Sequence, residues 1–355
     1  GYTCGDLFLQ DTLLQGAEDA LAHILEETKD LDMLTAVGLP VRSKWDHKLY
    51  NCAAVICKGE LLGLVPKTHI PNYGEFYEAR WFASGAELDT LVNLCGQNVS
   101  LYSNVVWECE TMPNLVVGVE ICEDLWSVQP PSIAMARAGV TLVLNLSASN
   151  ELAGKAAYRR QLVAGQSGRL VCGYVYADAG EGESTTDLVF AGHNIIAENG
   201  AVLSEVRFKT GLTISEIDVD KLVFERRKMN TFAPPRRDPM EEAHAIGIGR
   251  ASFSLDLSDT ALTRPIGKNP FVPADHGDCK ERCGEIFTIA ALGLKKRLAH
   301  THASCAVVGL SGGLDSTLAL LITARAMDLL GRPRSDILAV TMPCFGTTSR
   351  TKSNA

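Results

Sequence analysis

The sequence predicts an α/β protein with two domains, and three observations carry this prediction. The chain has 355 residues, of which 46% are hydrophobic and 21% charged, a balance typical of folded globular proteins. Strand-like and helical runs alternate along it, as layered α/β domains require. A proline-containing stretch without clear periodicity, 256–275, separates a long first part from a short second part.

The elements expected in the first part alternate in type. A helix is predicted over 5–30, where apolar residues recur at helical spacing between acidic ones. The alanine-rich segment 132–138 and segment 158–169 are also predicted to be helical. Strands are predicted for the apolar runs 34–39, 53–57, 61–65, 115–121, 141–146 and 171–177, with a polar connection at 46–51.

The domain limits follow from the segments after these strands. A β-hairpin is predicted at 194–206, because Asn199-Gly200 separates two apolar runs. Arg226-Arg227-Lys228 and Pro234-Pro235 then break the pattern. We therefore predict a first domain at 1–255, a linker at 256–275 and a second domain at 276–355. The second domain is expected to contain helices at 285–298 and 317–330 and strands at 305–310 and 335–343.

Composition excludes several classes of function. The chain has 33 Lys and Arg against 42 Asp and Glu, a net charge of −9, which disfavours nucleic-acid binding. No apolar run reaches the ~18 residues that a membrane span needs. Eleven cysteines without a repeated spacing indicate reduced thiols in the cytoplasm. Neither Cys279 with Cys283 nor the group His300, His302 and Cys305 has zinc-finger spacing, so no metal site is expected.

The segment 116–124 carries the first candidate catalytic residue. Its apolar run ends abruptly in Cys122-Glu123-Asp124, which places the thiol at a sheet edge where a turn begins. A cysteine in such a turn can be a nucleophile, and the N–H groups of the turn can hold an oxyanion. The alternative is a small packed residue, as unpaired cysteines usually are. Nearby carboxylates should raise the thiol pKa, so a nucleophilic Cys122 needs a cation or a base.

Lys67 is the candidate for that cation. It follows a strand-like run and precedes Thr68-His69-Ile70-Pro71. Taken alone, such a lysine is more often a surface residue, because lysine is almost never fully buried without a partner. Lys67 and Cys122 together indicate nucleophilic catalysis much more specifically than either residue does alone.

The combination resembles the nitrilase-like glutaminase domain of glutamine-dependent NAD⁺ synthetases. Matching stretches, in the family's order, are KTHIPNYGEFYEARWF (67–82), VEICEDLW (119–126), NLSAS (145–149) and GEGESTTDL (180–188), and the resemblance extends to about residue 250. It implies an α-β-β-α sandwich with a Glu-Lys-Cys triad, in which Cys122 is the nucleophile and Lys67 stabilises the transition state. It also implies a glutamine pocket lined by Tyr73, Phe76, Glu123, Ser149 and Lys155. Glu123 and Lys155 have the charges that the α-amine and α-carboxylate of glutamine require.

The resemblance places the general-base glutamate of the triad outside this sequence. In the family it lies in a Pro-Glu-Leu stretch just before Gly-Tyr, and Gly1-Tyr2 open this chain. We therefore expect a chain truncated at its start that hydrolyses glutamine very poorly. Without a base, Cys122 stays mostly a thiol near pH 7, and loss of one triad member commonly costs several powers of ten in rate.

The segment 305–330 carries a phosphate-binding pattern. Ser311-Gly312-Gly313-Leu314-Asp315-Ser316 lies between a predicted strand and a predicted helix. Glycines let the backbone approach a ligand closely, and hydroxyl and N–H groups at a helix start bind anions. Two glycines in a turn are common, but the whole pattern at a strand–helix junction is specific. It is not a Walker-type P-loop, because G-x-x-x-x-G-K-[ST] is missing.

The pattern resembles the PP-loop of ATP pyrophosphatases. The resemblance implies that Mg²⁺–ATP is bound by Gly309, Leu310, Ser311, Gly312, Gly313, Leu314, Asp315, Ser316, Thr341 and Met342, the last two against the adenine. Asp315, an anion, is expected to cap the helix or to act through Mg²⁺. Only about two strands of a parallel sheet of ~5 precede Ala355, so we expect an incomplete second domain, with the dinucleotide site beyond it.

Together the resemblances imply a carbon–nitrogen ligase. Ammonia from glutamine would amidate deamido-NAD⁺ to NAD⁺ at the expense of ATP, without a permanently bound cofactor. The enzyme is expected in the cytoplasm, as a homo-oligomer when full length, with no nucleic-acid or membrane partner. Three alternatives stay open: a stand-alone nitrilase-type amidase, an amidotransferase of another PP-loop type, and an inactive fragment that serves only as a binding module.

Overall fold

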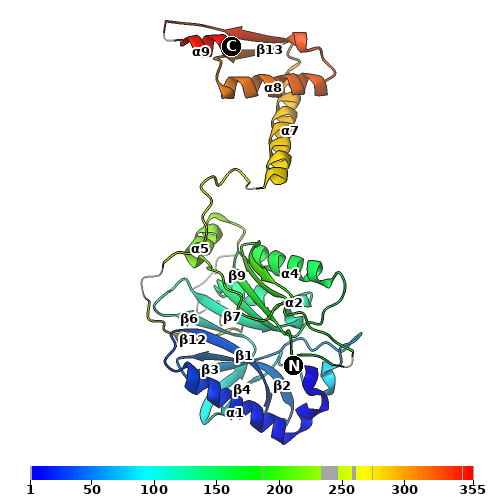
Figure 1. Cartoon of the computed structure of the whole chain (residues 1–355), viewed down its shortest axis with the longest axis vertical. Coiled ribbons are helices and arrows are strands. Elements are labelled where there is room, and N and C mark those ends of the chain that lie inside the picture. Colours follow the sequence, from blue (N-terminus) through cyan, green and yellow to red (C-terminus); the bar gives the residue numbers. More distant parts are fainter. Residues whose placement is uncertain are drawn as a thin grey trace. The chain divides into compact units, whose positions relative to one another are not determined.

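The computed structural model describes residues 2–185, 187–232, 247–257, 261–273, 275–345 and 347–354. The chain divides into two compact units, Gly1–Arg264 and Pro265–Ala355, which are described separately (Figure 1). The division falls inside the segment 256–275, where a linker is predicted. The predicted break at Pro234-Pro235 lies outside the described residues.

Two β-sheets form the centre of the first unit. One has the order β1-β2-β3-β5-β4, and the other has the order β11-β10-β9-β8-β7-β6-β12. The strands of the first sheet are β1 (Leu34–Arg42), β2 (Leu49–Cys57), β3 (Glu60–Pro66), β4 (Asp89–Leu94) and β5 (Gln97–Tyr102). Those of the second are β6 (Val105–Cys109), β7 (Val116–Ile121), β8 (Leu142–Ser147), β9 (Gly173–Asp178), β10 (Asn194–Glu198), β11 (Ala201–Val206) and β12 (Gly249–Phe253). In the second sheet, β7, β8 and β9 are parallel neighbours, so their carboxyl ends meet at one edge.

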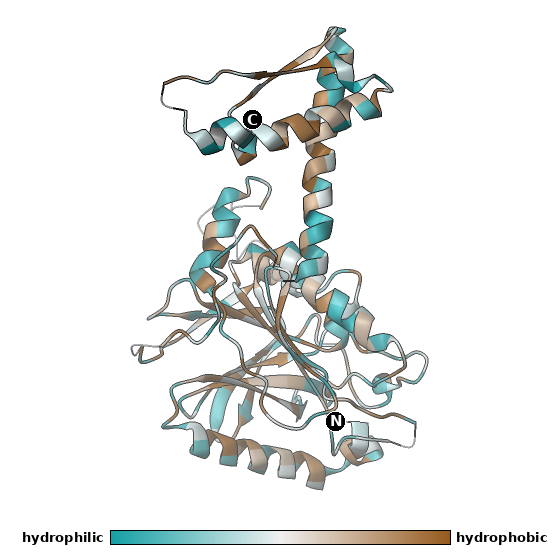
Figure 2. Cartoon of the chain, turned by 45° about the horizontal axis from the view of Figure 1, so that its top comes forward, coloured by the Kyte–Doolittle hydropathy of each residue, from teal (hydrophilic) through white to brown (hydrophobic). Residues whose placement is uncertain are grey.

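Three apolar layers hold the sheets and helices together. Helix α1 (Asp11–Thr28) packs Leu21 and Leu25 onto the first sheet. Helices α3 (Ser132–Arg137) and α4 (Lys155–Leu170) cover the second sheet. Between the sheets, residues such as Val55 and Trp107 are fully buried. Figure 2 shows the apolar residues concentrated on the strands. The predicted α-β-β-α sandwich is confirmed.

Several predicted elements differ in detail from the structure. The helix predicted over 5–30 is a 3₁₀ segment, η1 (Tyr2–Leu9), followed by α1, because Gln10 between them has an extended backbone of φ −97° and ψ 130°. Within η1, Gly5 is a further kink, with φ 51° and ψ −132°. Arg226-Arg227-Lys228, predicted as a break, is the last turn of α5 (Val219–Lys228), whose N-cap Asp218 accepts a hydrogen bond from Lys221 N–H. Strands β4, β5, β6 and β12 were not predicted, because their short segments lack a continuous apolar run.

The predicted hairpin of β10 and β11 is confirmed. Its register runs from Asn194 opposite Val206 to Glu198 opposite Ala201. Asn199 and Gly200 both have positive φ, at 46° and 85°. Two consecutive residues with positive φ are what a tight hairpin turn requires, and asparagine and glycine tolerate them best.

The second unit begins with the long helix α7 (His276–Thr301), followed by β13 (Ala306–Leu310), α8 (Leu314–Leu329), η3 (Arg334–Asp336), β14 (Ile337–Thr341) and α9 (Ser349–Asn354). β13 and β14 pair in parallel with α8 as the crossover. A small core of Leu298, Ala326 and Met327 joins α7 to α8. Within the described part of the chain, no helix combines the length and hydrophobicity that a membrane crossing requires.

Replacing Gly85 by alanine is expected to destabilise the first unit by about 2 kcal/mol, a typical overpacking cost. A Cβ at Gly85 would lie 2.5 Å from both Cβ and Cγ of Pro66, and the rigid proline ring cannot move away. Gly85 N–H also donates to the carbonyl of Lys67, so the strain reaches the end of β3. Urea unfolding of G85A and the parent measures the loss.

Gly16→Ala is the matched control for this prediction. Gly16 lies in the exposed part of α1, and a Cβ there meets no atom within 4 Å. Alanine is the better helix former, so G16A should be as stable as the parent or more stable. Equal stability of G85A and G16A would contradict the predicted clash.

Candidate functional site

Cys122 lies at a sharp turn between β7 and the short helix α2 (Glu123–Trp126). Its backbone has φ 45° and ψ −99°, a conformation that residues with a side chain rarely adopt. Such strain persists only where the surroundings enforce it, and it collects at functional sites. Here Cys122 N–H donates to Asn145 Oδ1 at 3.1 Å, and the Cys122 carbonyl accepts from Leu125 N–H at 3.1 Å.

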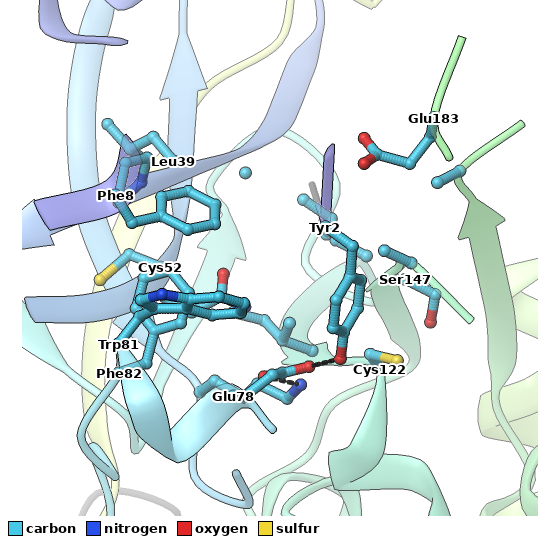
Figure 3. Close-up of a pocket in the computed structure, with 18 of the residues that line it drawn as sticks. Tyr2, Phe8, Leu39, Cys52, Glu78, Trp81, Phe82, Cys122, Ser147 and Glu183 are labelled. Carbon is cyan, nitrogen blue, oxygen red and sulfur yellow. Dashed lines mark hydrogen bonds and ion pairs between the residues drawn. The ribbon is translucent and has the colours of Figure 1, made fainter. Parts of the chain in front are cut away.

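The Cys122 side chain faces a cavity of about 390 Å³ (Figure 3). Phe8, Leu39, Trp81 and Phe82 form apolar walls. Among the other lining residues are Lys67, Glu78, Ser147 and Asp178, which supply polar groups that act on the thiol, and Glu183, which lies farther from it (Figure 3). An apolar cavity with a few convergent polar groups is the usual form of a small-molecule site.

Lys67 shares this cavity with Cys122 and is almost completely buried, with 1% of its surface exposed. It follows β3, and its N–H donates to the carbonyl of Asn51 at 2.8 Å. Its ammonium lies 2.7 Å from Glu78 Oε2. Burial opposes the charged form, but Cys122 and Glu78 more than compensate, and the pKa of Lys67 is raised. Lys67 is therefore a buried cation beside the thiol.

Glu78 was missed by the sequence analysis. It begins the short segment η2 (Glu78–Arg80), is 4% exposed, and bridges Lys67 and the hydroxyl of Tyr2, which donates to Glu78 Oε1 (Figure 3). The available signal was one of two carboxylates, Glu75 and Glu78, inside the aromatic-rich stretch 67–82. A second missed residue, Asp124, accepts hydrogen bonds from His69 N–H and Ile121 N–H, and so ties the segments after β3 and β7 together.

The thiol of Cys122 has a raised pKa. Burial is the main cause; Lys67 opposes it, while Glu78 and Asp178 add to it. Burial also raises the pKa of Asp178 to about 6. The resting side chain is therefore a thiol near neutral pH, and attack on a substrate requires that a base take its proton.

The five predicted glutamine-pocket residues gather beside the cavity and do not line it. Tyr73 donates to Glu123 at 2.6 Å, and its ring lies 6.0 Å from that of Phe76. Phe76 in turn lies 5.9 Å from Tyr2, which does line the cavity. Glu123 follows Cys122 directly, so this group adjoins the thiol.

Lys155 and Ser149 complete the group from α4 and the loop before it. The Lys155 ammonium lies 5.4 Å from the Phe76 ring and 5.3 Å from the Trp126 ring. Burial, and next the charge of Arg159, lower the pKa of Lys155. Ser149 accepts a hydrogen bond from Arg159 at 3.1 Å. A carboxylate, an ammonium and an aromatic face thus lie together, as an amino-acid ligand would need. These five assignments remain predictions.

Another buried carboxylate, Glu120, lies on β7, the strand that ends just before Cys122. It is 1% exposed, and burial raises its pKa to about 7. Its folded-state pKa exceeds the ordinary value of 4.5, so the folded state binds the proton more tightly than the unfolded chain. The stability that this proton contributes is present below pH 4.5 and is lost as the pH rises through 7.

Glu120→Gln is therefore expected to flatten the pH dependence of stability. The shift from 4.5 to about 7 corresponds to about 3 kcal/mol. Relative to the parent, E120Q should gain about that much free energy of unfolding between pH 4.5 and pH 8. Urea unfolding of both proteins across this range measures the difference, and parallel curves would contradict it.

The phosphate-loop candidates lie between β13 and α8. Gly312 has φ 77°, and the Ser311 and Ser316 hydroxyls lie 3.2 Å apart and close the turn. Gly313 is the N-cap of α8 and provides no side-chain cap, so the first N–H groups of the helix are available to an anion. Asp315 lies in the first turn of α8, not at the N-cap, so of its two predicted roles capping is not observed. Thr341 ends β14, and Met342 is exposed beside it.

No group of three or more metal-ligating side chains is placed to hold an ion within the described ranges. Magnesium bound as part of a nucleotide complex at the phosphate loop remains a prediction. The described loop suits such a complex, since it offers hydroxyls, open N–H groups and one carboxylate, Asp315.

Comparison with known proteins defines the class. Residues 1–226 match the family model of carbon-nitrogen hydrolases, and the chain belongs to this family. Residues 286–355 match the model of NAD synthase. The curated relatives with both regions are glutamine-dependent NAD(+) synthetases: that of Mycobacterium tuberculosis (strain ATCC 25618 / H37Rv) is 42% identical over 100% of this chain and 52% of its own, and that of Aquifex aeolicus is 28% identical over 97% and 53%.

A solved structure agrees with this fold. The glutamine-dependent NAD+ synthetase of Acinetobacter baumannii, in complex with ADP, covers 99% of this chain and 53% of its own, with a TM-score of 0.50 and 24% identity. That of Cytophaga hutchinsonii has a TM-score of 0.50 at 21% identity. At these identities the likeness concerns the fold alone. The chain spans about half the length of the curated relatives it matches.

Proposed function

We propose that the first unit is the glutaminase of a glutamine-dependent NAD⁺ synthetase. The observation that carries the proposal is the shared cavity, in which a cysteine at a strained turn faces a buried lysine–glutamate pair. The pairing of the two family matches supports it. Tyr73, Phe76, Glu123, Ser149 and Lys155 would bind the amino-acid end of glutamine, with Glu123 on the α-amine and Lys155 on the α-carboxylate.

The chemistry begins at the glutamine side-chain amide. A base removes the thiol proton, and the Cys122 sulfur adds to the amide carbon. The Lys67 ammonium and backbone N–H groups of the sharp turn at Cys122, here called the Cys122 elbow, hold the oxyanion of the tetrahedral intermediate. The C–N bond then breaks, the departing nitrogen takes up a proton and leaves as ammonia, and a thioester remains. Water cleaves the thioester to glutamate and restores the thiol.

For the whole protein we propose that this ammonia is used at a second site. ATP bound at Gly309–Ser316, with Thr341 and Met342 against adenine, would adenylate the carboxylate of deamido-NAD⁺ and release pyrophosphate. Ammonia would displace AMP and form NAD⁺. The open helix start at α8 supports phosphate binding there. All eleven cysteines are free thiols, which supports a reducing cytoplasmic location; a homo-oligomeric state belongs to the same proposal.

Two assays test the proposal. Glutamate release from glutamine, compared with release from asparagine and from simple aliphatic amides, tests the glutaminase and separates it from a general amidase. Exchange of labelled pyrophosphate into ATP that depends on deamido-NAD⁺ tests the synthetase. Preference for simple amides, or exchange without deamido-NAD⁺, would contradict the respective half.

A further inference from the structure

A chain of buried hydrogen bonds runs beneath the Cys122 elbow and takes no part in the steps above. Cys122 N–H donates to Asn145 Oδ1 at 3.1 Å, and Asn145 Nδ2 donates to the hydroxyl of Tyr174 at 3.1 Å. The Tyr174 hydroxyl donates to Glu120 Oε1. Asn145, Tyr174 and Glu120 are each at most 1% exposed, so no bulk water replaces these partners.

This chain of hydrogen bonds from Cys122 through Asn145 and Tyr174 to Glu120 is called the relay below. Its far end, at Glu120, is fixed by the helices that cover the sheet. Glu120 Oε2 accepts the N–H of Ser132, the first residue of α3, at 2.9 Å. Gln166 of α4 donates to the Ser132 hydroxyl at 2.9 Å. When it is ionised, Glu120 therefore accepts a backbone N–H at one oxygen and a tyrosine hydroxyl at the other, and the Ser132 hydroxyl is a further donor to it. A carboxylate satisfies both donors, whereas an amide side chain offers only one acceptor atom.

The direction of each bond determines the next one. Because Tyr174 donates to Glu120, its oxygen accepts from Nδ2 of Asn145. With Nδ2 turned towards Tyr174, Oδ1 of Asn145 faces Cys122 N–H and also accepts from Ser147 Oγ at 2.7 Å. A reversed Asn145 amide would set its NH₂ against Cys122 N–H and leave that buried donor without an acceptor.

We infer that Glu120 and Tyr174 are positioning residues, which fix the orientation of the Asn145 side chain and thereby hold the strained backbone at Cys122. The φ of 45° at Cys122 is unfavourable by itself, so the hydrogen bond to its N–H is needed to keep the thiol facing Lys67. The inference rests on the proposed function only in taking Cys122 as the nucleophile.

The test compares Glu120→Gln, Tyr174→Phe and the double variant in the full chain. In E120Q the amide oxygen must face Ser132 N–H, so its NH₂ faces Tyr174 and reverses the relay. In Y174F the relay is interrupted, because the hydroxyl is missing.

The probe is iodoacetamide, and the alkylation rate of Cys122 is followed across pH by mass spectrometry of its peptide. A relaxed elbow moves the thiol away from Lys67, so the alkylation rate at pH 8 should fall about tenfold. Where glutamine turns over, kcat should fall about as much, with KM changed less than about twofold.

The double variant and a control make the test decisive. Since Y174F already breaks the relay, adding E120Q should change the rate by less than about twofold. Tyr50→Phe is the control, because it removes another tyrosine–carboxylate hydrogen bond, 2.6 Å long, from a buried tyrosine of the other sheet to the exposed Asp46. Y50F should lose stability but keep the Cys122 profile.

Unchanged Cys122 profiles in E120Q and Y174F would overturn the inference, as would additive effects in the double variant. Should E120Q not fold, Y174F decides alone, because it introduces no new polar group. A full-length enzyme that does not hydrolyse glutamine would count against the proposed function, whereas the alkylation profiles of this chain would still test the positioning roles.

Discussion

In the full-length enzyme, replacing Cys122 by alanine is expected to abolish glutamine hydrolysis and to leave the fold intact. The thiol forms the bond to the amide carbon, and no other group can replace it, so the rate should fall by a factor of about 10³ or more. The side chain lines a cavity, and Ser147, with which it shares a hydrogen bond, keeps its own bond to Asn145 Oδ1, so little stability is lost. Glutamate release and urea unfolding measure the two effects.

A covalent probe makes this prediction independent of turnover. A glutamine analogue that carries an electrophile in place of the amide should label the parent once per chain, on the Cys122 peptide, and should not label C122A. Cys172→Ala is the matched control, since Cys172 is another fully buried thiol, outside the cavity. Labelling of C122A at a different cysteine would show that the nucleophile is misassigned.

The second large effect is expected at Lys67. Lys67→Met removes the cation of the buried Lys67–Glu78 pair. Glu78 then keeps its hydrogen bond from the hydroxyl of Tyr2. An uncompensated buried charge typically costs about 3–5 kcal/mol, so K67M should unfold at much lower urea concentration. It should also lose most of its glutaminase activity, because the oxyanion then keeps the backbone N–H groups but loses its cation.

The double variant K67M/E78Q separates the two effects. Removing both charges abolishes the buried-charge penalty, so most of the stability should return, but activity should not. Lys58→Met is the control, because Lys58 pairs with Asp32 and Asp256 at the surface, where solvent screens the interaction. Regained activity in K67M/E78Q, or equal losses of stability in K67M and K58M, would contradict the role assigned to Lys67.

Most of the layered fold was predictable, because its central strands are continuous apolar runs. The runs at 53–57, 115–121 and 141–146 all became strands with buried residues, and Asn199-Gly200 became the hairpin turn. The strands β4, β5 and β6 were not predictable in this way. The alternating burial of β4 and β5 depends on which partner strand covers each face, and a single short segment does not reveal this. β6 is mostly buried, but its apolar run is only three residues long.

The candidate site was only partly predictable for a related reason. Cys122 and Lys67 each follow a recognisable strand, so their chemistry could be inferred from local sequence together with a family resemblance. Glu78 and Tyr2 could not, since a carboxylate and a phenol in polar surroundings are ordinarily exposed. Their role follows from Lys67, whose burial requires an opposite charge within hydrogen-bond distance.

By itself, the sequence determined the α/β class, the central strands, the nucleophile motif at Cys122, the phosphate-loop motif at 311–316, and the reduced state expected of the cysteines. The tertiary structure alone decided which side chains meet. Sequence separation carries no information on such contacts: Glu78 reaches Tyr2 across 76 residues, and Tyr174 reaches Glu120 across 54. These polar partners are selected by burial, because a charged or hydrogen-bonding group removed from water must find its complement wherever the packed layers bring one within reach.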